Sequence, residues 1–269
     1  MDLATVTSYR PALERGDLAL GPGERLLGGG TWLFSEPQPG TTGLVDLTTL
    51  GWPPAESLPG GGLRVSATCT VAGLLELPWG GGPGDLARTC ADALLMSFKV
   101  RASATVGGNV CLALPAGAVL ALTAALDGEA VIWTAGGGER RERVVDLVTG
   151  VGTTTLRHGE VLRAVDLPAR ALRCRTAGRR ISLTERGRTS SLVLGRADEH
   201  GTTLTVTGAT TRPVVIHLPA DEGRAARRDR LVAGLGAVDC WYDDPHGAAD
   251  WREAVTGLLA AEVLEELTS

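Results

Sequence analysis

Two stretches of the chain combine consecutive glycines with a small polar side chain. "LLGGGTWLF" occupies residues 26–34 and "ATVGGNVCLALP" occupies residues 104–115. In each, an apolar run typical of a β-strand ends in glycines, and a polar residue, Thr31 or Asn109, follows the glycines. Glycines at a strand end can turn successive N–H groups outward into an anion-binding nest, and without a Cβ a phosphate can approach the backbone. Two such nests, brought together by the fold, could hold a diphosphate.

Known nucleotide motifs do not explain these glycines. Neither stretch matches the G-x-G-x-x-G fingerprint or the P-loop pattern with its Lys and Ser/Thr, so neither a Rossmann site nor a P-loop site is expected. A strand followed by Gly-Gly is also typical of a sheet corner or a β-bulge. The residues alone leave both interpretations open.

The cysteines and histidines do not form a metal-binding pattern. The chain has 5 cysteines, an odd number, and they are widely spaced with no C-x-x-C pair. The 4 histidines are scattered along the chain. This excludes a recognisable iron–sulfur or zinc motif and makes a disulfide framework unexpected. We therefore expect no metal site. His246, in "DDPHG", is interpreted as a loop residue that caps the final helix or bonds Asp243 or Asp244, rather than as a general acid or base.

Composition describes a soluble globular protein. The 269 residues, 43% hydrophobic and 21% charged, suffice for one large domain or two ordinary ones. A net charge of -5 argues against nucleic-acid binding as the main function. The arginine clusters at 139–143 and 224–230 are interspersed with acids and indicate solvated faces. No apolar segment is long enough to span a bilayer and no signal peptide is recognisable, which makes the cytoplasm the expected location.

The glycine stretches must be positioned by strands and helices that the apolar periodicity predicts. The expected strands before residue 168 lie at 24–29, 42–47, 62–67, 130–133 and 159–168, and "ATVGG" (104–108) is expected as a strand entering a tight turn. The expected helices are 70–77, capped by Thr70, 84–97, with Asp85 at its start, and 117–128. After residue 168 we expect a run of strands and a helix over 250–267, whose apolar stripe would comprise Trp251, Val255, Leu258, Leu259, Val263 and Leu267.

Four segments resemble a known family in order and spacing. "LLGGGTWL", "LRVSATCT", "SFKVRASATVGGNVCLALPAGAVLALTAALDGEAVIW" and "GEVLRAVDLP" are similar to the FAD-binding subunit or domain of the molybdenum hydroxylases. That family includes xanthine dehydrogenase, aldehyde oxidase and carbon monoxide dehydrogenase. The last hundred residues resemble the family's C-terminal flavoprotein domain. The likeness covers nearly the whole chain and is most specific from Arg101 to Asn109.

The resemblance implies a fold class, a cofactor and a set of binding residues. The fold would be α+β, with an FAD-binding domain of the vanillyl-alcohol-oxidase type over residues 1–168. A smaller domain of antiparallel sheet and helix would follow over 169–269. Two glycine loops would hold the diphosphate of FAD. The implied cofactor-binding residues are Gly28, Gly29, Gly30, Thr31 and Trp32, then Ala67 and Thr70, then Arg101, Thr105, Gly107, Gly108 and Asn109, and the position of Ala118.

The chain also departs from the family pattern. Ala118 stands where the family usually has Asp, and Leu112, Ala113 and Leu114 replace residues that are often polar. In the family, polar side chains at these positions reach the ribityl chain and the flavin ring, so the resemblance implies that this chain makes fewer or different contacts there. Because one lost hydrogen bond costs about 1 kcal/mol, binding is expected to survive. Lys99 replaces a common neutral amide and is interpreted as an exposed lysine.

The resemblance implies an FAD-dependent oxidoreductase subunit that relays electrons from a molybdenum and iron–sulfur partner to NAD or oxygen. Molybdopterin-binding and iron–sulfur subunits would then be partner chains, and a homodimer is a further possibility. Two alternatives stay open: a stand-alone flavin-dependent oxidase or dehydrogenase acting on a small molecule, and a scaffold of the same fold without flavin. No catalytic acid or base is nominated, because the redox chemistry belongs to the flavin. Cys111 is interpreted as a small buried hydrophobe rather than a covalent flavin link.

Overall fold

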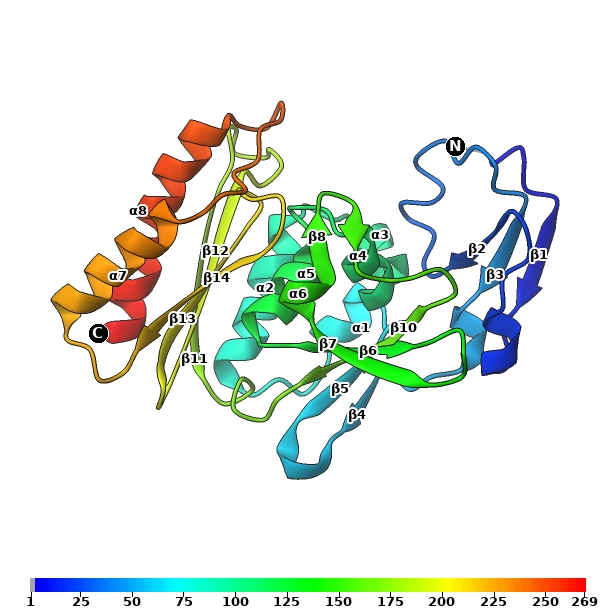
Figure 1. Ribbon diagram of the computed structural model, residues 1–269, viewed down its shortest axis with the longest axis horizontal. Coiled ribbons are helices and arrows are strands. Elements are labelled where there is room, and N and C mark those ends of the chain that lie inside the picture. The colour runs from blue at the N-terminus through cyan, green and yellow to red at the C-terminus, as the bar shows by residue number, and fades with distance from the viewer. Residues whose placement is uncertain (1–2) are drawn as a thin grey trace.

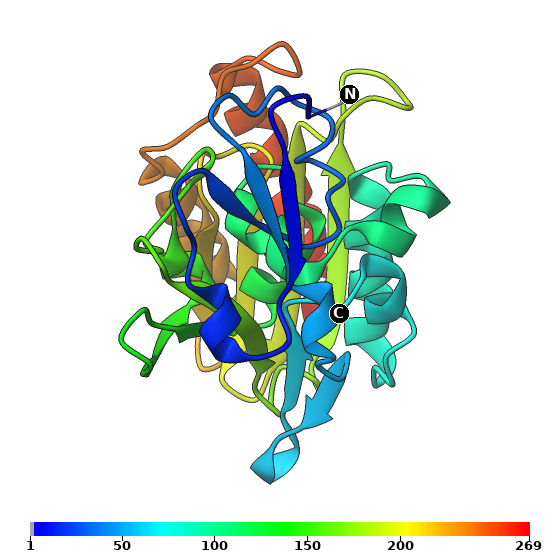
Figure 2. The same ribbon diagram turned by 90° about the vertical axis from the view of Figure 1, so that its right-hand side faces the viewer.

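The computed structural model describes residues 3–269, and its chain begins with a small parallel sheet. The strand order is β1-β3-β2, and both pairings are parallel. This sheet packs on the rest of the molecule through its own apolar cluster, which includes Val45 and Val161 with Trp133 against them. Figure 2 looks onto this sheet, which lies in front of the helices. The strands are β1 (Ser8–Pro11), β2 (Glu24–Leu27) and β3 (Gly43–Asp46).

The middle of the chain forms a five-stranded antiparallel sheet in the order β4-β5-β10-β6-β7. Helices α4 and α5 pack against one face of it, and α5 is buried along its whole length because its sequence, AVLALTAA, is almost entirely apolar. The strands are β4 (Ala55–Ser57), β5 (Leu63–Ser66), β6 (Glu129–Trp133), β7 (Glu139–Arg143) and β10 (Val161–Leu167). The helices over and beside them are α1 (Val71–Leu75), α2 (Gly81–Ala93), α3 (Phe98–Ser103), α4 (Val106–Leu112), α5 (Ala118–Ala125) and α6 (Val144–Leu147).

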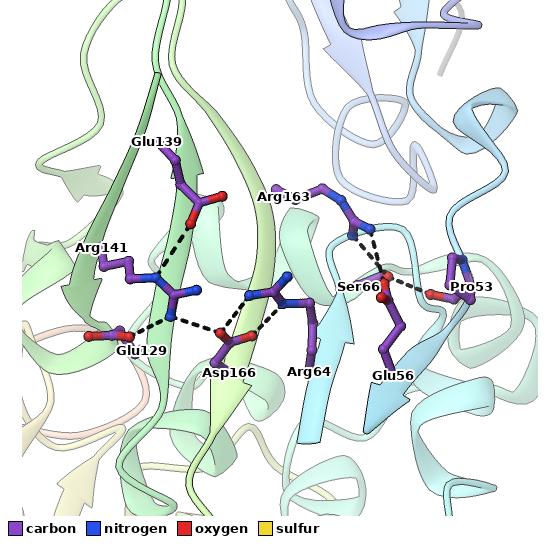
Figure 3. A network of polar contacts seen from close by, with 9 residues as sticks. All are labelled: Pro53, Glu56, Arg64, Ser66, Glu129, Glu139, Arg141, Arg163 and Asp166. Atoms are coloured by element: carbon purple, nitrogen blue, oxygen red, sulfur yellow. Dashed lines mark hydrogen bonds and ion pairs between the residues drawn. The ribbon is translucent and has the colours of Figure 1, made fainter. Parts of the chain in front are cut away.

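The other face of this sheet carries a network of ion pairs (Figure 3). Asp166 on β10 receives hydrogen bonds from Arg64 Nε at 2.7 Å and from Arg141 Nη1 at 2.9 Å, and Arg141 also binds Glu129. Burial alone would raise the pKa of Asp166, but the two arginines outweigh it and hold the pKa below its ordinary value. The network therefore joins strands β5, β10, β6 and β7 on their solvent side.

The C-terminal part is an antiparallel sheet between two helical layers. Helices α7 and α8 cover one face, and α2 and α5 lie against the other (Figure 1). Leu192 and Leu194 of β12 belong to the same apolar core as α5, so this core continues past residue 168. The expected domain boundary at 168 stays a prediction. The elements are β11 (Arg175–Ile181), β12 (Ser191–Asp198), β13 (Gly201–Thr207), β14 (Val214–Pro219), α7 (Arg224–Gly236) and α8 (Ala249–Thr268), with β8 (Val148–Gly150) and β9 (Thr153–Thr154) forming a separate hairpin.

The structure confirms the α+β class and corrects three local predictions. Residues 104–108 are the start of helix α4, not a strand entering a turn. Helix α2 begins at Gly81, so Asp85 lies a turn inside it and not at its start. On α8, Leu258 is 68% exposed, and the buried face includes Arg252 and Thr256 instead. Helical spacing alone could not show this, because polar partners on other elements decide which face of α8 is buried.

Among residues 3–269, no helix combines the length and the hydrophobicity needed to cross a bilayer.

Candidate cofactor-binding cleft

A cavity of about 530 Å³ lies where the loop after β2 meets the start of α4. Both glycine stretches line it, although 70 or more residues separate them in the sequence. The structure therefore brings together most of the residues expected to bind a cofactor. Those lining the cavity are Gly28, Gly29, Gly30, Thr31, Trp32, Thr105, Gly108 and Asn109.

The loop after β2 lines this cavity with residues whose backbone amides have no acceptor within residues 3–269. Within residues 3–269, none of the N–H groups of residues 28–33 has a hydrogen-bond acceptor, whereas the next amide, that of Phe34, donates to the Gly30 carbonyl. Backbone N–H groups in folded proteins are nearly always paired, with protein, solvent or ligand. Gly30 has φ 69, a left-handed conformation that a glycine adopts without strain. The loop therefore has the donors that an anionic ligand needs.

The two glycine stretches touch each other directly. A Cβ on Gly29 would lie 1.6 Å from the carbonyl oxygen of Ser103, and one on Gly28 would lie 2.8 Å from Thr105 Oγ1. At Gly29 the obstacle is backbone, which cannot rotate away. The close crossing of two chain segments thus requires glycine here, independently of any ligand.

The second glycine stretch does not form the expected nest, because its amides are already paired. Thr105 is the N-cap of α4, and its Oγ1 accepts from the Gly108 N–H at 3.1 Å. The Gly107 N–H donates to the Ala67 carbonyl at 2.7 Å. A Cβ on Gly107 would lie 2.7 Å from the Ala67 Cβ, so this glycine allows α4 to pack on the end of β5. The stretch supplies shape and side chains to the cavity rather than amides.

Asn109 joins the cavity to helix α5. Its Oδ1 accepts from the backbone N–H groups of Val119 at 2.9 Å and of Leu120 at 3.1 Å, and so caps α5. The polar amide in an apolar run is explained by these two bonds. With Oδ1 occupied, the Nδ2 group is the donor that this side chain can offer to a ligand.

Five of the expected cofactor-binding residues do not line the cavity, and Gly107, which packs against Ala67, is one of them. Ala67 is buried beneath Gly107, and Thr70 is the N-cap of α1. The Arg101 guanidinium binds Asp92 at 2.8 Å and the Met96 carbonyl. Ala118 is 2% exposed at the start of α5, behind Asn109. These residues support the cleft, and their direct contact with a cofactor stays a prediction.

A second cavity, also of about 530 Å³, continues from the first. The two share Thr31, Trp32, Ala104, Asn109 and Leu112 in their linings. One wall of the second cavity is apolar and includes Leu94, Leu95, Met96, Val100, Leu114 and Pro115. A second wall is polar and comes from the C-terminal part of the chain, with Arg188, Tyr242, Asp244, His246 and Arg252.

This polar wall is held by a buried arginine that the sequence analysis missed. Arg252 is 1% exposed, donates to the Gly247 and Gly208 carbonyls and pairs with Asp244. Burial lowers its pKa, and the attraction of Asp244 opposes that shift. The Gly208 N–H in turn donates to the Pro115 carbonyl at 2.7 Å, which connects the polar wall to the apolar one. An arginine within the apolar pattern of 250–267 is the signal that could have revealed it.

His246 takes the position expected of a loop residue. Its backbone N–H donates to Asp244 Oδ1 at 2.7 Å, and its carbonyl accepts from Ser190 Oγ at 2.5 Å. The residue is bonded to Asp244 through its backbone only, and within residues 3–269 the imidazole makes neither the expected helix cap nor a bond to Asp243 or Asp244. Lys99 is exposed on α3, as expected. No group of three or more His, Cys, Asp or Glu side chains within residues 3–269 is arranged to hold a metal ion.

Cys111 lines the first cavity as a protonated thiol. Burial raises its pKa to about 12, so the nucleophilic thiolate is rare near neutral pH. The expected small buried hydrophobe is thus only half-buried, because the side chain lines the cavity.

An α+β architecture with two joined cavities, and with loop amides that have no acceptor within residues 3–269, is typical of a cofactor-binding domain. The model of the FAD-binding domain in molybdopterin dehydrogenase matches residues 7–170 of the chain. The chain belongs to this family, which confirms the resemblance and the family cofactor, FAD. No curated protein sequence matches the chain.

Solved structures share the fold over almost the full chain. Carbon monoxide dehydrogenase from Oligotropha carboxidovorans, in reconstituted form, matches with a TM-score of 0.83 at 19% identity, covering 99% of each chain. The enzyme from Hydrogenophaga pseudoflava, which lacks the Mo-pyranopterin moiety, matches at 0.83, 17% identity and 97% of each chain. Quinoline 2-oxidoreductase from Pseudomonas putida 86 matches at 0.79 and 18% identity, covering 99% of this chain and 98% of the other. The expected flavoprotein fold, with its smaller C-terminal sheet and helices, is confirmed.

Proposed function

We propose that the chain binds one FAD with its diphosphate against the backbone amides of residues 28–33. The observation that carries this proposal is that residues 28–33 line the cavity and that, among residues 3–269, their N–H groups have no acceptor. Hydrogen bonds to a charged acceptor contribute about 1.5–3 kcal/mol each, so a few of them suffice for firm binding. The Asn109 amide adds a donor on the opposite side of the cleft.

The two cavities fit the two ends of this cofactor. Thr31 and Asn109 belong to the linings of both cavities, and the diphosphate would lie at this junction. The apolar wall of the second cavity suits the tricyclic flavin ring. The first cavity, with Glu24, Arg25 and Gln38 in its lining, offers polar groups to the adenosine hydroxyls.

We further propose that the chain is the flavoprotein subunit of a molybdenum-hydroxylase-type enzyme and passes electrons from a molybdenum and iron–sulfur partner to NAD or oxygen. FAD supplies the redox chemistry when bound, since it accepts electron pairs and single electrons. The residues of this chain bind it, orient its ring between the two walls of the second cavity and shield it from water. The names of the structural relatives, carbon monoxide dehydrogenase and quinoline 2-oxidoreductase, support partner chains that carry the other centres.

Purification of the chain with and without its co-expressed neighbours tests this proposal. The isolated chain should be yellow, with one FAD per chain by absorbance after denaturation. Co-purification with molybdopterin-binding and iron–sulfur subunits is expected, and size-exclusion chromatography would show whether the free chain forms a homodimer. A colourless protein that does not take up FAD would favour the scaffold alternative. Turnover of a small substrate by the isolated yellow chain would favour the stand-alone enzyme.

A further inference from the structure

The polar wall of the second cavity contains two side chains without a polar partner. Within residues 3–269, neither the Arg188 guanidinium nor the His246 imidazole forms a hydrogen bond or an ion pair, although both line the cavity. The other charges of this wall, Arg252 and Asp244, neutralise each other. Among the described residues of this wall, Arg188, which is exposed at the edge of the cavity, is the positive charge without a partner, and the His246 imidazole is a further donor.

The position of these two groups relative to the apolar wall suggests what they could bind. Arg188 belongs to the loop between β11 and β12, and His246 to the loop before α8, so both come from the C-terminal part of the chain. Leu94, Leu95 and Met96 line the same cavity, and the Thr189 hydroxyl beside Arg188 donates to the Ala93 carbonyl. Leu95 has φ 54, a conformation that is strained for a non-glycine residue and is often found at functional sites. A ligand in this cavity would therefore meet both an apolar surface and a cation.

We propose that Arg188 and His246 form a subsite for the oxyanion of a small planar molecule that lies beside the flavin ring. An arginine can bind a carboxylate or a phosphate through two parallel hydrogen bonds, and its planar fork favours such flat groups. The apolar wall and the ring would enclose the rest of the molecule. This inference rests on the proposed FAD site, and it adds selection of an anionic small molecule as the partner of the flavin.

Binding of simple aromatic anions tests the subsite. Benzoate and phenyl phosphate are titrated into the full chain by isothermal titration calorimetry, with benzamide as the neutral analogue of benzoate. We expect both anions to bind and benzamide to bind about tenfold more weakly or not at all, since it has no negative charge to pair with the Arg188 guanidinium. The tighter of the two anions identifies the oxyanion that the subsite prefers. In the FAD-loaded chain, benzoate should also perturb the visible flavin spectrum.

Matched variants of one loop separate the subsite from general charge effects. Arg188→Met should weaken benzoate binding by about tenfold or more, the equivalent of one charge-assisted hydrogen bond. Arg186→Met removes an exposed arginine of the same loop that does not line the cavity, and it should leave the affinity within about twofold. Thermal melting of both variants checks that they fold.

Three results would overturn the subsite: no binding of either anion, equal binding of benzamide and benzoate, or unchanged affinity in Arg188→Met. Calorimetry reports these results whether or not FAD is present. A chain that fails to bind FAD contradicts the proposed function, whereas an FAD-loaded chain that ignores benzoate contradicts only this inference.

Discussion

Gly29 and Ser103 are in backbone contact across the cleft, so close that a Cβ on Gly29 would lie 1.6 Å from the Ser103 carbonyl oxygen. This contact fixes the loop after β2 against the residues that lead into α4. The free amides of residues 28–33 therefore have a defined direction before any ligand binds. Such preorganisation reduces the entropy cost of binding an anion.

Gly29→Ala should abolish FAD binding. The added methyl cannot fit, so the loop must move away from Ser103 and its amides lose their common direction. Gly136→Ala is the matched control, because a Cβ there meets nothing within 4 Å. Flavin content after purification measures the effect. Wild-type flavin content in Gly29→Ala would contradict the role given to this contact.

Asn109→Asp should separate fold stability from cofactor binding. The carboxylate still accepts from the Val119 and Leu120 N–H groups, and a negative charge at a helix N-terminus is favourable, so the melting temperature should be kept or raised. The Nδ2 donor, however, is replaced by an anion that repels the diphosphate. We expect FAD affinity to fall about tenfold or more, measured by fluorescence titration of the apoprotein. Unchanged affinity would place the diphosphate elsewhere.

Two threonine caps allow a paired comparison. Thr105→Val and Thr70→Val each remove an N-cap, of α4 and α1 respectively, which costs about 1 kcal/mol of stability. Only Thr105 lines the cavity, and its Oγ1 lies beside Gly28. Equilibrium unfolding in urea should therefore show similar losses, while FAD affinity should fall only in Thr105→Val. An equal loss of affinity in Thr70→Val would show that Thr70 contacts the cofactor.

The sequence predicted the meeting of the two glycine stretches but not the different parts they play. Glycine and apolar runs indicate that the chain turns, yet they do not show which carbonyl pairs with which amide. Thr105 begins a helix because its side chain caps Gly108, and Ala67, far away in sequence, accepts from Gly107. A short segment rich in β-branched residues was therefore misassigned. The buried Arg252 was missed for the same reason, since its partners lie on other segments.

The cysteines should be unreactive in the native protein. Burial raises the pKa of Cys69 to about 11 and that of Cys111 to about 12, and it also raises the pKa of the other three. Iodoacetamide at pH 8 should modify them only after unfolding, as mass spectrometry would show.

Acid precipitation of the flavin-loaded protein should release all flavin into the supernatant, because we expect no covalent link to Cys111. A yellow pellet from wild type but not from Cys111→Ser would reveal a covalent link.

Glu24 should make the cavity region sensitive to acid. Hydrogen bonds from Arg10 and from the Gly21 N–H lower its pKa to about 2, from an ordinary 4.5. The ionised group therefore stabilises the fold at pH values above 4.5, and this stabilisation is lost as the pH falls towards 2. In Glu24→Gln, thermal melting should depend less on pH over this interval. Glu36→Gln, which changes an exposed glutamate nearby in sequence, should follow the wild-type curve.

Hydrogen exchange of the backbone amides tests the central claim most directly. In the apoprotein, the amides of residues 28–33 should exchange rapidly, whereas those of Val106 and Gly107, already bound to Cys69 and Ala67, should be protected. Addition of FAD should slow exchange at residues 28–33 by about tenfold or more, with little change at the start of α4. Unchanged exchange at residues 28–33 in a protein saturated with FAD would contradict the account.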